Sequence, residues 1–140
     1  MAALISYFTA ASGLVLLAVM FQLMIRGIEA GTLVLNGLLG LRTPATKRSQ
    51  AAWDAGHRAA LPGLRVLVVV TAIAAVLPLP FTFGLGYRTD RAFIATEVVL
   101  GFAYAAVIGL LLVIGRTADR AARAVPAGQV AAPRTRWDRR

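Results

Sequence analysis

The chain has 140 residues, of which 59% are hydrophobic, and its mean hydropathy is +0.73. A domain of this size has too little interior to bury so much apolar surface, so a water-soluble fold is excluded. The net charge is +9, but the basic residues lie between and after the apolar segments. This pattern predicts contact with anionic lipid headgroups and argues against nucleic acid as a partner. The lack of cysteine excludes disulfides and thiol chemistry.

Three segments are apolar and long enough to cross a hydrocarbon core about 30 Å thick as helices. They cover residues 4–25, 64–83 and 93–114. No basic residue precedes the first, and it is longer than the core of a signal peptide, so we expect it to stay as an anchor. Residues 27–41 are apolar but short and contain Glu29 and Asn36. We interpret them as an extension of the first helix followed by a bend.

The basic residues predict the topology. Thirteen of them lie in residues 26–65 and 116–140, whereas only Arg88 and Arg91 lie between the second and third spans. The positive-inside rule therefore predicts an N-terminus outside the cell and a cytoplasmic C-terminus, in a bacterial plasma membrane. We expect a three-span domain over residues 1–116, with a cytoplasmic loop at 26–63, and a basic tail over 117–140.

The cytoplasmic loop carries the most specific pattern. It reads N-x-x-x-G-L-R-T-P-x-T, then W-x-x-x-H-R, on Asn36, Gly40, Leu41, Arg42, Thr43, Pro44, Thr46, Trp53, His57 and Arg58. The pattern resembles the signature of the SdpI-like family, named for a bacterial immunity protein that protects its producer from its own killing factor. The resemblance extends over roughly the first two-thirds of the chain. It implies an immunity or signalling role and a packed cluster of Arg42, Trp53 and His57.

The residues after Pro44 predict a helix over 47–60 that lies along the inner membrane surface. Thr46 is its predicted N-cap, and Trp53 is expected at headgroup level with its N–H in water. His57 is the single histidine. A metal site there would need more ligands than Asp54, and Ser49 lies two turns away, so a structural or partner-contact role is favoured over a catalytic one.

The third span contains Glu97, and an intramembrane carboxylate indicates a partner contact or a proton carrier. The alternatives are that it reaches outward to the headgroups or accepts a hydrogen bond from Thr96 or Tyr104 within the bundle. Asp90 is the predicted N-cap of this helix.

The same span has small residues at Gly101, Ala105 and Gly109, a spacing that lets another helix approach closely. That helix belongs either to this chain or to a partner. Thr9 and Gly13 form a weaker notch on the first span.

After the third span, Arg116, Arg120 and Arg123 share one helix face, and Pro126 ends the regular structure. Such a face is typical of binding to anionic headgroups, and docking on a protein is the alternative.

The predicted fold class is an all-α membrane protein of three transmembrane helices plus an amphipathic cytoplasmic interfacial helix. We find no nucleophile–base pair, phosphate loop, metal cluster or cofactor motif, and therefore expect neither an enzyme nor a bound cofactor. The leading functional hypothesis is an accessory subunit of a larger membrane protein complex, such as a lipid or envelope transport complex. The second is an immunity or signalling protein that sequesters a toxin or regulator, and the third, a small proton-coupled carrier, depends on Glu97.

Overall fold

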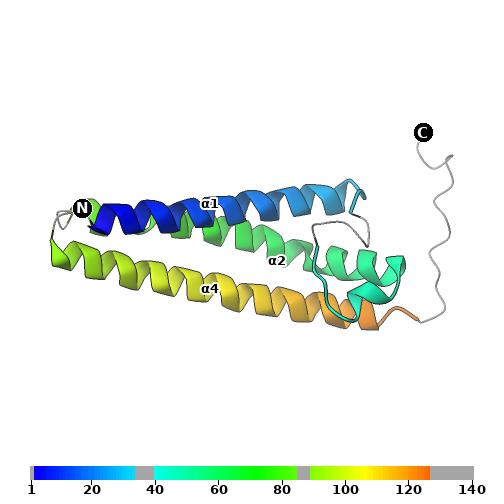
Figure 1. Cartoon of the computed structure of the whole chain (residues 1–140). Coiled ribbons are helices and arrows are strands. Elements are labelled where there is room, and N and C mark those ends of the chain that lie inside the picture. Colours follow the sequence, from blue (N-terminus) through cyan, green and yellow to red (C-terminus); the bar gives the residue numbers. More distant parts are fainter. Residues whose placement is uncertain (1, 34–39, 85–88, 127–140) are drawn as a thin grey trace. The chain divides into compact units, whose positions relative to one another are not determined.

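The computed structural model describes residues 2–33, 40–84 and 89–126. Within these ranges the chain is helical and has no strand (Figure 1). The elements are α1 (Ala2–Glu29), η1 (Thr46–Arg48), α2 (Gln50–Val76), α3 (Leu79–Gly84) and α4 (Asp90–Arg123). Three helices are long and apolar enough to cross a membrane: Leu4–Glu29, Gln50–Val76 and Asp90–Arg123. The predicted all-α membrane fold with three spans is confirmed.

The chain forms two compact units, and α1, α2 and α4 each contribute to both of them. Unit 1 contains residues 1–23 and 63–112, and unit 2 contains residues 24–62 and 113–140. Asn36 and the predicted tail beyond Pro126 lie outside the described residues.

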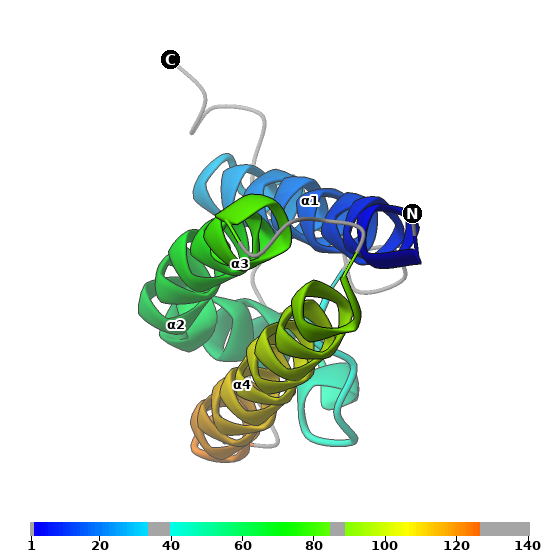
Figure 2. The same cartoon turned by 90° about the vertical axis from the view of Figure 1, so that its left-hand side faces the viewer.

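In unit 1 the helix parts from α1, α2 and α4 surround a small core (Figure 2). Leu14, Leu67 and Val107 are buried at its centre. Two tyrosines bond neighbouring helices to each other, since the Tyr7 hydroxyl donates to the carbonyl of Ala75 at 3.0 Å and the Tyr104 hydroxyl to that of Ala10 at 2.8 Å. Such bonds fix the register of helices that have no water to compete for their polar groups.

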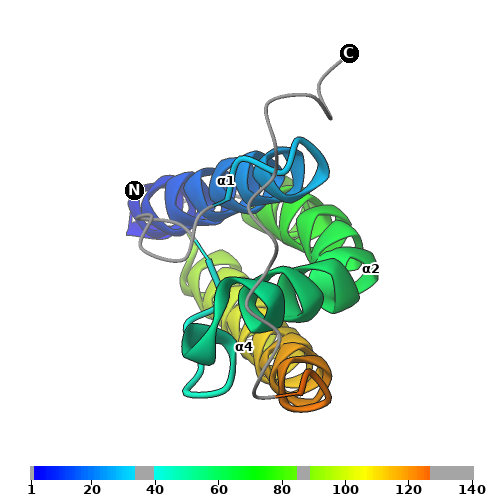
Figure 3. The ribbon, with the colours of Figure 1, turned by 90° about the vertical axis from the view of Figure 1, so that its right-hand side faces the viewer.

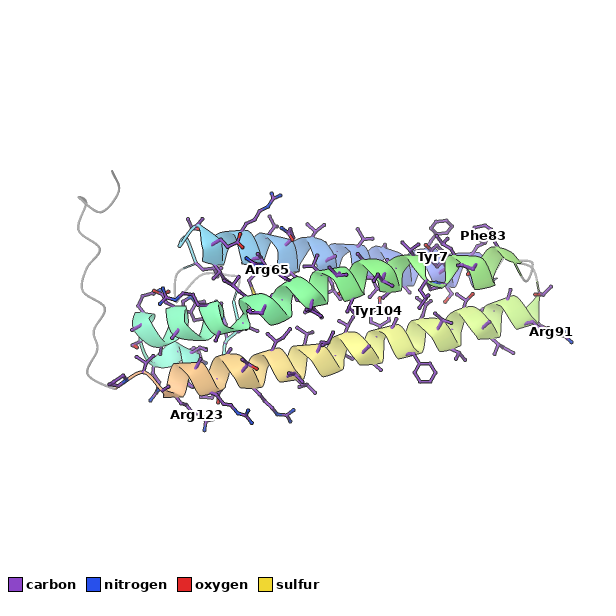
Figure 4. The ribbon with its side chains drawn as sticks, turned by 180° about the vertical axis from the view of Figure 1, so that it is seen from behind. Tyr7, Arg65, Phe83, Arg91, Tyr104 and Arg123 are labelled. Carbon is purple, nitrogen blue, oxygen red and sulfur yellow. The ribbon has the colours of Figure 1, made fainter. Side chains whose placement is uncertain are left out.

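The outward faces of unit 1 are apolar. In the most hydrophobic stretch of each spanning helix only 22% to 33% of the residues are buried in the protein, so lipid must cover the rest. Arg65 and Arg91 lie at opposite ends of this unit, with the apolar stretch between them (Figure 4). Unit 1 is therefore the membrane-spanning part of the chain.

The second span, predicted as one apolar segment over residues 64–83, is divided between two helices. Helix α2 ends at Val76, and the short helix α3 follows from Leu79. Pro78 and Pro80 lack the amide hydrogen that a continuing helix needs, which accounts for the break. The Thr82 hydroxyl bonds both the carbonyl of Pro78, at 3.0 Å, and the Thr96 hydroxyl of α4, at 2.8 Å, and so attaches α3 to α4.

Two predicted N-caps were wrong, the first by three residues and the second by one. Thr46 does not cap the loop helix; the Ser49 hydroxyl accepts the Ala52 N–H at 3.1 Å and begins α2. At α4 the Thr89 hydroxyl accepts the Ala92 N–H at 3.2 Å, so Thr89 is the cap rather than Asp90. Both caps use the side-chain oxygen to satisfy an unpaired amide of the first turn.

The separate interfacial helix was also a wrong prediction. Residues 50–60 are helical, but they are the first turns of α2, which continues through Pro62 to Val76. The apolar stretch of α2 begins only after Pro62, in unit 1, whereas its first turns carry the polar residues of the loop pattern in unit 2. Trp53, the residue expected to hold that helix at headgroup level, is buried in unit 2.

Candidate functional site

The site is a buried pair of rings in unit 2, one turn apart on α2. The Trp53 side chain is 0% exposed and that of His57 1% exposed, and their ring centroids are 4.1 Å apart. The predicted headgroup position of Trp53 is therefore wrong. Its indole Nε1 is buried and has no hydrogen-bond partner in the part of the chain that the structure describes.

Both ring nitrogens of His57 are bonded to backbone. Nε2 lies 2.8 Å from the amide nitrogen of Leu41, and Nδ1 lies 2.8 Å from the carbonyl oxygen of Trp53. Because an amide can only donate and a carbonyl can only accept, the ring must be neutral, with its proton on Nδ1. His57 thus links the loop at Leu41 to the first turns of α2.

Burial lowers the pKa of His57 from its ordinary value of 6.5. The hydrogen bond to the Trp53 carbonyl and the nearby carboxylate of Asp54 oppose this shift but do not reverse it. The charged form loses its hydration on burial, and it would also place an Nε2–H against the Leu41 N–H. The ring is therefore held neutral.

Gly40 lets the loop approach the two rings. Its φ is +144°, a conformation that residues with a side chain rarely adopt. A Cβ there would lie 2.4 Å from two carbons of the Trp53 ring and 2.9 Å from His57 Nε2. Glycine is thus required at this position for two separate reasons, conformation and space.

Thr46 organises the rest of the loop. It is fully buried, its hydroxyl donates to the carbonyl of Leu41 at 2.7 Å, and it accepts the amide of Thr43 at 2.9 Å. The Thr43 hydroxyl in turn accepts the amide of Thr46 at 3.2 Å. These reciprocal bonds close the turn around Pro44, and the bond from Thr46 fixes the carbonyl of Leu41 in place.

The last turns of α4 pack against this loop and the first turns of α2 (Figure 3). A Cβ on Gly56 would lie 3.0 Å from the carbonyl oxygen of Ala118, so α2 and α4 come close to backbone contact there. Arg48 Nη2 donates to the carbonyl of Ala122 at 2.8 Å, in the last turn of α4, where carbonyls lack helical partners.

Asp119 on α4 binds the same loop. The Thr43 hydroxyl is the main cause that lowers the pKa of this carboxyl, and Arg123 and the Ala45 amide add to the effect. Arg123 Nη2 lies 2.6 Å from Asp119 Oδ2. Sequence reasoning missed both Asp119 and Arg48, because their partners are backbone and hydroxyl groups that are 74 or more residues away in the chain.

The motif residues that form this site lie within the match to a known family model. The model of the SdpI/YfhL protein family matches residues 32–117, which is more than half of the chain. The chain belongs to the SdpI/YfhL family. The match begins after α1 and extends far into α4, so it is not confined to the first two-thirds of the chain as expected. No curated protein and no solved structure matches.

The structure divides the family pattern into buried and exposed residues. Gly40, Thr43, Trp53 and His57 form the site, together with Leu41 and Thr46. The side chains of Arg42, Pro44 and Arg58 are exposed. Of the expected cluster of Arg42, Trp53 and His57, the structure brings the two rings together, and the backbone amide of Leu41 bonds the histidine. The part of Arg42 in this cluster stays a prediction.

The cavities of this SdpI/YfhL family member differ in size and character. The one beside the two rings, lined by Trp53, His57 and Arg58 among others, holds about 30 Å³. That is far below the few hundred Å³ typical of small-molecule sites. A cavity of about 370 Å³ in unit 1 has a wholly apolar lining: Val70, Ile73, Ala74, Leu77, Val99, Phe102, Ala103 and Ala106. Among the described residues no three His, Asp or Glu side chains are placed to hold a metal ion.

The remaining predicted residues lie on α4. Gly101 and Gly109 have nothing within 4 Å of an added Cβ, and the side chain of Ala105 is exposed. Of the two alternatives for this face, packing within the chain is wrong for the described residues. Arg116, Arg120 and Arg123 are exposed in unit 2. Glu97 accepts a hydrogen bond from the Ser6 hydroxyl of α1, and the donors expected for it are wrong, because Thr96 bonds Thr82 and Tyr104 donates to the carbonyl of Ala10.

Proposed function

We propose that this chain is a non-catalytic binding protein of the SdpI immunity type. It acts in the bacterial plasma membrane, with its N-terminus outside and its C-terminus in the cytoplasm. It sequesters a toxin or a regulatory protein at the membrane. The observation that carries the proposal is the bonding of His57, whose two nitrogens are both committed to backbone in a chain that belongs to the SdpI/YfhL family.

The chemistry of the family pattern supports binding rather than reaction. A general base or nucleophile needs a free lone pair that a substrate can reach. His57 is 1% exposed and its single acceptor nitrogen already holds the Leu41 amide. The pattern thus builds the shape of the cytoplasmic loop, and the exposed side chain of Arg58 can contact lipid or a partner.

Purification of the tagged full-length chain from its native membrane in mild detergent tests the proposal. Recovery of a secreted peptide toxin or of a cytoplasmic regulator at near-equal amounts supports it. If the chain is recovered alone, even from cells grown with a strain that secretes such a toxin, the proposal is contradicted. The Gly40→Ala variant, in which the loop cannot form as described, should lose the partner while unit 1 still inserts.

A second candidate is an accessory subunit of a larger membrane complex, such as a lipid or envelope transport complex. The open face of α4 at Gly101, Ala105 and Gly109 favours it, because a neighbouring helix can come close there. Recovery of a large transporter in the same purification supports this candidate over the first.

The exposed arginines at the end of α4 are proposed to bind anionic headgroups, each contributing about 1 kcal/mol near the surface.

Deletion of residues 126–140 leaves the three spanning helices intact and tests whether the tail binds headgroups or docks on a protein. If the tail docks on a protein, recovery of the partner should fall. If it binds only lipid, recovery should be unchanged, because Arg116 and Arg120 remain.

A further inference from the structure

Glu97 lies on a lipid-facing part of unit 1. It is seven residues after Asp90, at which α4 begins, and thus about 10 Å along the helix. Its neighbours Ile94, Val98 and Phe102 are 59%, 52% and 75% exposed. A carboxylate therefore opens onto a face that is otherwise made of large apolar side chains.

The contact of Glu97 with Ser6 satisfies only part of the carboxylate. The Ser6 hydroxyl donates to Oε1, which joins α4 to α1 within unit 1. An ionised carboxylate can accept about four hydrogen bonds, and Ser6 can donate one. The side chain of Glu97 remains exposed. An ionised group in this position is costly in hydrocarbon unless a donor or a positive charge meets it.

We infer that Glu97 and Ser6 form a docking site for a membrane-inserted helix that carries a lysine or arginine at the same depth. Charge complementarity selects this occupant, because a cationic side chain is the group that best compensates a carboxylate facing lipid. Gly101 and Ala105 follow Glu97 at four-residue intervals, so the backbone of such a helix can approach α4 beside the charge pair. The inference rests on the proposed binding function and names the chemistry of its partner.

A defined peptide tests the inference without knowledge of the natural partner. The labelled full-length chain is placed in zwitterionic phospholipid vesicles together with a labelled single-span peptide of leucine and alanine. One peptide carries a lysine at the depth of Glu97, and the control peptide carries leucine there. Energy transfer between the labels measures association. We expect the lysine peptide to associate about tenfold more tightly, as one polar contact between helices in lipid allows.

Variants of the chain assign the effect to the carboxylate. Glu97→Gln keeps an acceptor for Ser6 but loses the charge. The association of the lysine peptide with this variant should fall to that of the leucine control peptide. Glu29→Gln removes a carboxylate at the end of α1, outside unit 1, and should change nothing. Glu97→Lys should prefer a peptide that carries glutamate at the same depth. Poor insertion cannot produce a new preference for the glutamate peptide, so this charge reversal tests the inference even if Glu97→Gln inserts poorly.

The outcomes separate this inference from the proposed function. Equal association of the lysine and leucine peptides with the wild-type chain, or no change in Glu97→Gln, overturns the docking site. Recovery of a toxin, regulator or transporter by the Glu97→Gln chain at wild-type level also overturns it, but leaves the proposed binding function standing. Selective binding of the lysine peptide together with failure to recover any native partner supports the site and contradicts only the cellular role.

Discussion

A side chain on Gly40 would collide with the indole ring of Trp53, since an added Cβ lies 2.4 Å from two of the ring carbons. The two residues are separated by the whole turn around Pro44 and by η1. Their contact decides where the loop lies on α2. It also explains why a glycine and a tryptophan that are thirteen positions apart belong to one pattern.

Gly40→Ala should therefore destabilise unit 2. The strained φ and the displaced ring together should cost about 2 to 5 kcal/mol. Thermal unfolding of the detergent-purified protein, followed by tryptophan fluorescence, measures the loss. Gly115→Ala is the matched control, because nothing lies within 4 Å of its added Cβ and alanine favours the helix. Equal melting temperatures for Gly40→Ala and wild type would contradict the described loop.

Two substitutions of His57 should differ in a way that only a structural role predicts. Glutamine can still accept the Leu41 amide, so His57→Gln should retain partner recovery with a modest loss of stability. Phenylalanine keeps a ring but leaves the partly buried Leu41 amide without its acceptor, at a cost of about 1 to 3 kcal/mol. Denaturant or thermal unfolding ranks the two variants. Complete loss of function in His57→Gln at normal protein level and partner recovery would indicate chemistry at His57.

The lowered pKa of His57 predicts how stability depends on pH. In the unfolded chain the ring takes up a proton near its ordinary value of 6.5, whereas the folded ring resists protonation to lower pH. Stability is therefore complete above pH 6.5 and falls as the pH drops toward the folded-state pKa, by at most about 1.4 kcal/mol per pH unit. Melting temperatures between pH 8 and pH 5 measure this slope, which His57→Gln should remove.

Asp119 acts in a different pH range. The hydrogen bond from Thr43 lowers the pKa of this carboxyl below 3.8, so its contribution persists above that pH and disappears only as the pH falls further. A slope that persists between pH 8 and pH 5 in His57→Gln would show that another group is responsible.

Bulky substitutions at Gly13 and Gly109 should have different effects on stability, because one glycine is packed against a neighbouring helix and the other is open. Gly13→Leu should destabilise the fold by about 1 to 3 kcal/mol, because an added Cβ already lies 2.9 Å from the Tyr104 hydroxyl. Gly109→Leu should leave the melting temperature unchanged, since nothing lies within 4 Å there. If Gly109→Leu also lowers partner recovery, the open face of α4 is the binding surface.

The charge distribution predicts opposite locations for the two ends of the chain. A tag at Met1 should be accessible outside the cell, and one after Arg140 only inside, because thirteen of the fifteen basic residues flank the predicted cytoplasmic ends. Accessibility to a membrane-impermeant label measures this. Both tags on the same side would contradict the three-span topology.

The sequence by itself determined the three spanning helices, because hydropathy over some twenty residues depends only on local composition. It also identified Gly40, Trp53 and His57, whose spacing is visible in the chain. Only the tertiary structure decided that the amide of Leu41 bonds the histidine, since a backbone amide is not recorded in any residue pattern. In the same way, the roles of Arg48 and Asp119 depend on contacts between the end of α4 and the loop, which exist only in the folded chain. Whether a glycine face is open or filled depends on helix rotation, which is set by long-range contacts such as that of Tyr104 with Ala10.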